Sequence, residues 1–146
     1  MLKKQYRLNK KSAFTATYRL NNTYHIGGVT LFVGRKHRQQ AAGGRQQTNN
    51  NNSVSDSELS NSSLLTPHSS LTRAGFVVSK KTHKRAVKRN RLKRLMREAY
   101  RLLLKSGETG RSQEYMSLIF VGSERALDKN FTQMQNIIRE LLFKVK

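Results

Sequence analysis

The chain has 146 residues, enough for one compact domain and too few for two comfortable ones. It carries 29 Lys and Arg against 8 Asp and Glu, a formal charge of +21 whose self-repulsion favours a polyanionic partner, nucleic acid above all. The absence of cysteine excludes disulfides and thiolate metal sites. The apolar runs are shorter than a membrane span, and the start MLKKQYRLNK has no secretory apolar stretch, so we expect a cytoplasmic protein without a membrane partner.

Residues 1–19 are basic and contain a short helical pattern. Asn9 or Ser12 is the candidate cap of this helix, and Phe14 and Tyr18 fall on one of its faces. On composition alone, these two aromatic residues are read as ordinary core contacts.

Three segments have the β-branched and aromatic content of strands. The first, residues 23–34, reads as one long or broken strand with a bulge or bend at Gly27-Gly28. The second is RAGFVVSK, residues 73–80, and the third is YMSLIFV, residues 115–121. The last is the most apolar run and predicts a central strand buried on both faces.

Between residues 36 and 71 the composition changes to Gln, Asn, Ser, Gly and Thr. Such a segment cannot bury enough apolar surface to offset its conformational entropy, so it predicts a disordered low-complexity insert between two strands. Apart from Lys36 at its edge, its charged residues cancel, Arg38 and Arg45 against Asp56 and Glu58, so the excess positive charge belongs to the rest of the domain.

The segment from Lys84 to Arg101 is the most basic part of the chain, with nine Lys or Arg and one acid, Glu98. At about 100° per residue its side chains sort by face, which predicts a helix over 83–105 with Thr82 as cap. One face is apolar, with Leu92, Leu95, Met96, Ala99 and Leu103, and the other gathers Asn90, Arg94, Arg97 and Arg101. A start at His83 would put Lys88 and Arg89 near the apolar face, so either the first turn projects beyond the core or the helix starts later. A solvated face usually mixes charges of both signs, so we favour a polyanion-binding face.

A last helix begins after Asn130, with Gln133 at the capping-box position. The predicted order is α, β, insert, β, α, β, α. This order favours an α/β (α+β) two-layer sandwich in which helices pack on one mixed sheet.

The acids show no metal-ligand spacing, the four histidines are scattered, and no Gly-rich phosphate loop follows a strand. We therefore expect no catalytic and no metal-binding residue in this chain. Three alternatives remain open from the residues: a ribosomal or other structured-RNA-binding protein, a free-standing nuclease, and a DNA-binding protein that places the helix in a major groove.

The run RNRLKRLMRE, residues 89–98, preceded by Ser79-Lys80-Lys81, resembles the signature of the bacterial ribonuclease P protein subunit family. The resemblance extends through RLNKKSAF, the strand around Phe32, GFVVSKK and the terminal helix, about three quarters of the chain, and leaves out the insert.

This resemblance implies an α/β sandwich like a domain of a ribosomal small-subunit protein, with a left-handed strand–helix–strand crossover. It implies that the RNA of the ribonucleoprotein catalyses removal of the 5′ leader from precursor tRNA, with magnesium held mainly by RNA and no protein partner required. The leader would bind in a cleft at Phe14, Tyr18 and Phe32. The residues implied to bind the catalytic RNA are Lys80, Lys81, Lys84, Arg85, Lys88, Arg89, Asn90, Arg91, Lys93, Arg94, Arg97 and Arg101.

Overall fold

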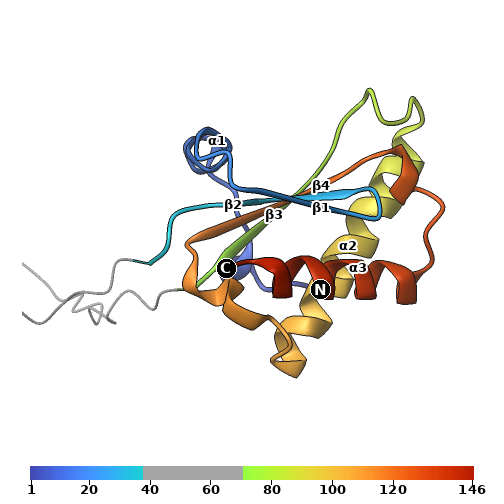
Figure 1. Cartoon of the computed structure of the whole chain (residues 1–146). Helices are drawn as coiled ribbons and strands as arrows, with labels where there is room; N and C mark the ends of the chain where they lie inside the picture. The colour runs from blue at the N-terminus through green and yellow to red at the C-terminus, as the bar shows by residue number, and fades with distance from the viewer. Residues whose placement is uncertain (38–70) are drawn as a thin grey trace, which may run out of the picture. The chain divides into compact units, whose positions relative to one another are not determined.

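The computed structural model describes residues 1–37 and 71–146 (Figure 1). Helices lie on both sides of one four-stranded sheet in this part of the chain. In chain order the elements are η1 (Lys4–Tyr6), α1 (Lys11–Arg19), β1 (Thr23–Ile26), β2 (Val29–Val33), β3 (Arg73–Val78), α2 (Ala86–Ser106), η2 (Gly110–Glu114), β4 (Ser117–Gly122), η3 (Glu124–Ala126) and α3 (Phe131–Lys144).

The sheet has the strand order β1-β2-β4-β3. β2 pairs antiparallel with β1 and β4, whereas β3 pairs parallel with β4. The parallel pair is connected through α2, as parallel neighbours require a crossover. The mixed sheet and the α+β class are therefore confirmed, and the left-handedness of the crossover stays a prediction.

The segment 23–34 is a β-hairpin, so the prediction of one long or broken strand was wrong. Gly27 and Gly28 both have positive φ, 56° and 88°, and Ile26 pairs directly with Val29 across them. Two successive residues with positive φ make the tight turn whose twist matches a hairpin, and glycine adopts that conformation at little cost. The Gly-Gly pair therefore reverses the chain and adds a strand to the predicted order.

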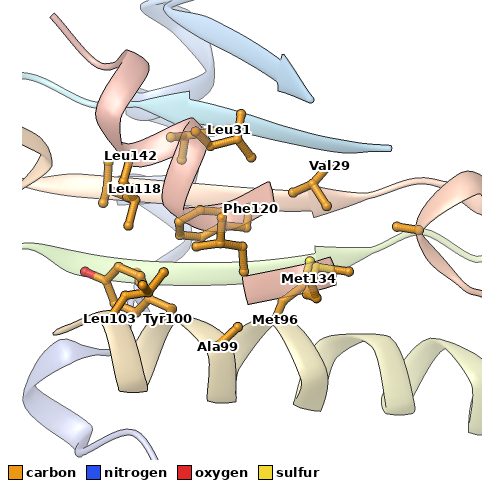
Figure 2. Close-up of a cluster of buried hydrophobic side chains, with 14 of the residues drawn as sticks. Val29, Leu31, Met96, Ala99, Tyr100, Leu103, Leu118, Phe120, Met134 and Leu142 are labelled. Atoms are coloured by element: carbon orange, nitrogen blue, oxygen red, sulfur yellow. The ribbon is translucent and has the colours of Figure 1, made fainter. Parts of the chain in front are cut away.

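The core lies between the sheet and the pair α2 and α3, with β4 at its centre (Figure 2). Leu118 and Phe120 of β4 are fully buried there, as predicted for a central strand. Phe120 stacks on Phe76 of β3, with ring centroids 5.4 Å apart, and its ring lies 5.5 Å from that of Tyr100 in α2. Aromatic pairs of this kind contribute about 0.5 to 1.5 kcal/mol each beyond their buried area.

The helix α2 presents the predicted apolar face to this core, since Leu92, Met96, Ala99 and Leu103 are buried. It ends at Ser106, one residue after the predicted end, and Gly107 caps it in a left-handed conformation with φ 76°. Its start lies later than His83, which was one of the two possibilities left open, and the prediction of Thr82 as its cap was wrong. The hydroxyl of Thr82 donates to the carbonyl oxygen of Gly122 at 3.4 Å instead of capping the helix, which begins only at Ala86.

The two other helices differ in how well their caps were predicted. In α3 the backbone N–H of Asn130 donates to Oε1 of Gln133 at 3.2 Å, which confirms the capping box. In α1 neither Asn9 nor Ser12 is the cap, because the helix begins one residue after Lys10, which makes no side-chain capping bond. The chain before it is extended, and the N–H of Leu8 donates to the carbonyl oxygen of Ala74 at 2.9 Å.

The predicted insert lies almost wholly outside the described residues. At its beginning, Lys36 forms an ion pair with Glu114 at 3.2 Å, and the N–H of His37 donates to the carbonyl oxygen of Glu114 at 2.7 Å. The packed chain thus continues two residues further than the composition indicated. Among the helices of residues 1–37 and 71–146, none is long and apolar enough to cross a membrane.

Candidate nucleic-acid interface

The side of α2 that faces away from the sheet carries the basic residues. Most of the side chains predicted to bind the catalytic RNA are exposed there or in the segment before the helix. The exposed ones are Lys80, Lys81, Lys84, Arg85, Lys88, Asn90, Arg91 and Arg94, and the partly buried ones are Arg89, Lys93, Arg97 and Arg101. The structure therefore brings these residues together along one helix and its leading segment.

The leading segment, residues 79–85, is held by a network of local hydrogen bonds. Nη1 of Arg89 donates to the carbonyl oxygens of His83 at 2.7 Å and Lys84 at 2.8 Å. Nδ1 of His83 accepts a hydrogen bond from the backbone N–H of Arg85 at 3.0 Å. Arg89 thus differs from its neighbours, because part of its guanidinium group is already engaged with the protein.

Arg101 is engaged as well. Its Nε and Nη2 donate to Oε1 of Glu98 at 3.0 and 2.5 Å. The hydrogen bond from Arg101 lowers the pKa of the Glu98 carboxyl. In contrast, Arg91 and Arg94 form no ion pair with any other residue that the structure describes. The side chains of Arg91 and Arg94 are therefore more available to a polyanion than that of Arg101.

A groove of about 470 Å³, the α2–α3 groove, separates the first half of α2 from the start of α3. Its apolar lining comes from Val87, Leu95 and Phe131. Asn90, Arg91 and Arg94 supply polar lining, together with Glu98, whose carboxylate is paired with Arg101. Sequence reasoning missed the role of Val87 and Phe131 here, because a groove between two helices depends on how they pack.

The helix α1 lies on the other side of the sheet from α2 and α3 (Figure 1). Its side chains pack on one row of cross-strand neighbours. This row consists of Phe32, Ile119 and Gly75, which are register partners on three adjacent strands. Tyr18 of α1 meets Phe32 edge to face, with ring centroids 4.8 Å apart and planes at 82°. Tyr18 is 38% exposed and Phe32 is half-buried, so both rings combine packing with access to solvent.

Phe14 occupies the far end of the same row. Its ring packs so closely on Gly75 that a Cβ atom there would lie 2.7 Å from Phe14 Cε1 and Cζ. Phe14 is therefore a packing residue for α1 as well as a half-exposed aromatic residue. Phe14, Tyr18 and Phe32 thus lie on the same side of the sheet along α1, and Tyr18 and Phe32 are in contact with each other. We call these three residues the aromatic cluster.

The next row on the same sheet face is only half-covered. It consists of Val77, Val121 and Thr30, followed by His25 on β1. Nδ1 of His25 and the hydroxyl of Thr30 lie 2.9 Å apart in a hydrogen bond. Sequence reasoning missed this half-covered row, although the alternation along each strand would have assigned its members to one face once the strand register was known.

Residues 1–37 and 71–146 contain no group of three His, Asp or Glu side chains that could hold a metal ion. Two of the described histidines form hydrogen bonds within the protein, His25 with the hydroxyl of Thr30 and His83 with the backbone N–H of Arg85. What the described surface offers chemically is a set of cationic donors on one side of the sheet and half-exposed aromatic rings on the other.

The model of the family described as Ribonuclease P matches residues 2–146. The chain belongs to this family. The matched residues include both the basic helix α2 and the aromatic cluster.

Curated relatives carry the name Ribonuclease P protein component. The chain is 67% identical to the protein of Marinomonas sp. over 30 residues, 20% of this chain and 23% of the relative. It is 38% identical to the protein of Thermoanaerobacter sp. over 72 residues, 49% of this chain and 57% of the relative. These alignments therefore span no more than about half of the relatives' length.

Solved structures of the Staphylococcus aureus RNase P protein share the fold. One, determined at 2.0 Å, has a TM-score of 0.57 and 19% identity, and the match covers 94% of this chain and 92% of that one. A second has a TM-score of 0.59 and 20% identity, with 97% and 90% covered. At this level of identity the likeness concerns the fold alone.

Proposed function

We propose that this chain is the protein subunit of ribonuclease P, which binds the catalytic RNA of that enzyme and the 5′ leader of precursor tRNA. The chain belongs to the ribonuclease P family, and α1 and α2 lie on opposite sides of its sheet (Figure 1). The observation that carries the proposal is that the exposed side chains of these two helices differ in chemistry. One surface is cationic and the other is aromatic. The subunit would work in the bacterial cytoplasm.

The cationic surface of α2 and residues 79–85 binds the catalytic RNA. Lys and Arg side chains that neutralise phosphates release condensed counterions, which makes binding strong and salt-dependent. The exposed side chains of Arg91 and Arg94 support this role. Lys80 and Lys81 extend the surface beyond the end of β3.

The aromatic cluster binds the single-stranded leader. Unpaired bases stack on exposed aromatic rings, at about 1 to 3 kcal/mol per base, and the stacking tolerates any base sequence. Tyr18 and Phe32 offer such rings, and burial raises the pKa of the Tyr18 phenol. The half-covered row of Val77, Val121 and Thr30 extends this surface along β3 in the direction of Lys80 and Lys81.

Cleavage is then the work of the RNA, with magnesium ions held mainly by RNA. The protein contributes by replacing counterions on the catalytic RNA and by positioning the substrate. Positioning lowers the barrier because the reacting groups are already oriented when the reaction begins. In this proposal the side chains of the protein transfer no proton.

Reconstitution tests this function. The purified chain, the catalytic RNA and the mixture are each incubated with precursor tRNA at low magnesium. We expect no cleavage by the chain alone and faster cleavage by the mixture than by the RNA alone. Cleavage by the chain alone, or a mixture no faster than the RNA, would contradict the proposal. Binding to the RNA without any stimulation would instead indicate a structural RNA-binding protein.

A further inference from the structure

The α2–α3 groove combines features that phosphate binding alone does not require. Val87 is 79% exposed although it lies within the most basic segment of the chain. It shares the groove with two other apolar residues, Leu95 of α2 and Phe131 of α3. Single exposed apolar residues are common on protein surfaces, but three that converge in one groove form a small apolar receptor.

The polar lining indicates what this receptor accepts. Arg91 and Arg94 are cationic, and neither is paired within the described residues. The side-chain amide of Asn90 offers both a donor and an acceptor. The negative charge of Glu98 is offset by Arg101, so the groove keeps a positive potential. An apolar protein segment would bury these cationic and amide groups without partners, which costs free energy.

A nucleobase matches both parts of the groove. It is flat and apolar on its faces, polar at its edge, and attached to phosphates on both sides. Proteins that read RNA sequence or shape bind unpaired bases by stacking them on aromatic rings or guanidinium planes and bonding their edges. Phe131 provides such a ring and Asn90 an amide for the edge, at one location.

We propose that the α2–α3 groove receives one unpaired nucleobase of the catalytic RNA. The base packs against Val87 and Phe131, its edge bonds to Asn90, and its flanking phosphates contact Arg91 and Arg94. The proposal rests on the proposed function and deepens it. The basic helix then recognises a particular unpaired position in the RNA in addition to neutralising phosphates.

The test uses neutral substitutions that remove the apolar surface but no charge. V87N makes an exposed position polar with little change in helix propensity, and V87I keeps it apolar. F131L removes the ring but keeps an apolar side chain, and F131Y keeps the ring. F143L, at a residue that is 60% exposed in the last turn of α3, is the matched control for loss of a ring.

We expect V87N and F131L to bind the catalytic RNA about 5- to 30-fold more weakly, as for a partly lost base contact. The slope of log affinity against log salt should stay unchanged, because no phosphate contact is lost. V87I, F131Y and F143L should bind like the wild type. Chemical probing should find one unpaired base that the wild type protects and V87N leaves reactive.

Removing that base from the RNA, with its backbone intact, completes the test. The abasic RNA should reproduce the loss caused by V87N, and combining the two changes should add nothing. Additive losses, no protected base, or wild-type affinity of both V87N and F131L would overturn the inference. Loss of self-association with unchanged RNA affinity would also overturn it, since the occupant would be a second copy. Failure of the wild type to bind the RNA would refute the proposed function itself.

Discussion

The guanidinium group of Arg89 donates a hydrogen bond from Nη1 to the backbone carbonyl oxygen of His83, at 2.7 Å. The same nitrogen donates to the next carbonyl oxygen, that of Lys84. Arg89 therefore holds the end of the leading segment, residues 79–85. This segment carries Lys80, Lys81, Lys84 and Arg85. We infer that Arg89 positions these cations more than it binds phosphate itself.

This role predicts the behaviour of R89Q. Loss of a partly exposed charge-assisted bond costs about 1 kcal/mol, so amide hydrogen exchange of residues 80–85 in the free protein should become about fivefold faster. R91Q removes the same charge from an exposed residue and should leave that exchange unchanged. Equal exchange rates in both variants would show that Arg89 does not position the segment.

Arg94 and Arg101 should contribute differently to the salt dependence of RNA binding. R94A removes an unpaired cation and should reduce the slope of log affinity against log salt by roughly one unit. The double variant E98Q/R101Q removes a paired cation and its anion, so the net charge is kept and the slope should change by less than about half a unit. A larger change of slope in E98Q/R101Q than in R94A would mean that Arg101 leaves Glu98 to bind phosphate.

The contact between Phe14 and Gly75 predicts a destabilising G75A variant. The added Cβ would lie 2.7 Å from the Phe14 ring, and overpacking of this kind costs about 1 to 3 kcal/mol of unfolding free energy. Denaturant unfolding measures this loss. In F14L the ring is absent, so the further change to G75A should cost clearly less than it does in the wild type. Equal costs in both backgrounds would show that α1 does not pack there.

Much of the fold could be predicted from the sequence because it depends on local pattern. The helical period placed Leu92, Met96 and Leu103 in the core, and the capping box placed the start of α3. The hairpin turn was missed because Gly27-Gly28 is compatible with both a bend and a reversal until its neighbours pair. Thr82 was misread because its partner, Gly122, lies 40 residues away.

In the candidate site, too, features that depend on local pattern could be predicted and features that depend on tertiary contacts could not. The basic residues from Lys88 to Arg101 share one helix, so their periodicity was sufficient to gather them on one side. The contact of Phe14 with Gly75 and the row of Val77, Val121 and Thr30 join separate strands, so they depend on sheet register. The engagement of Arg89 with His83 depends on how the segment before α2 folds back, which no residue pattern revealed.

Tyr100 predicts a specific loss of stability at high pH. Burial raises the pKa of Tyr100 to about 12, whereas the unfolded chain ionises this phenol near its ordinary value of 10.0. The folded state thus favours the neutral phenol. Its contribution is fully present below pH 10 and falls by about 1.4 kcal/mol per unit between pH 10 and 12.

The variant Y100F should lack this contribution. The Tyr100 hydroxyl has no hydrogen-bond partner among the described residues, so its removal should change stability at pH 7 by less than about 1 kcal/mol. Denaturant unfolding at pH 8, 10 and 11.5 compares the two proteins. If the unfolding free energies of wild type and Y100F fell in parallel with pH, Tyr100 would ionise equally easily in the folded and unfolded states.

The affinity of the reconstituted particle for the leader distinguishes the role of the aromatic cluster from that of the cationic surface most directly. It is measured as the ratio of affinities for precursor and mature tRNA, with the wild type, Y18A and R94A each saturating the catalytic RNA. Y18A should reduce this ratio by about 5- to 150-fold, equivalent to about 1 to 3 kcal/mol of binding free energy. Y18F should preserve the ratio, and R94A should leave it unchanged although it weakens assembly. An unchanged ratio in Y18A, or an equal loss in R94A, would contradict the assignment of the leader to the aromatic cluster.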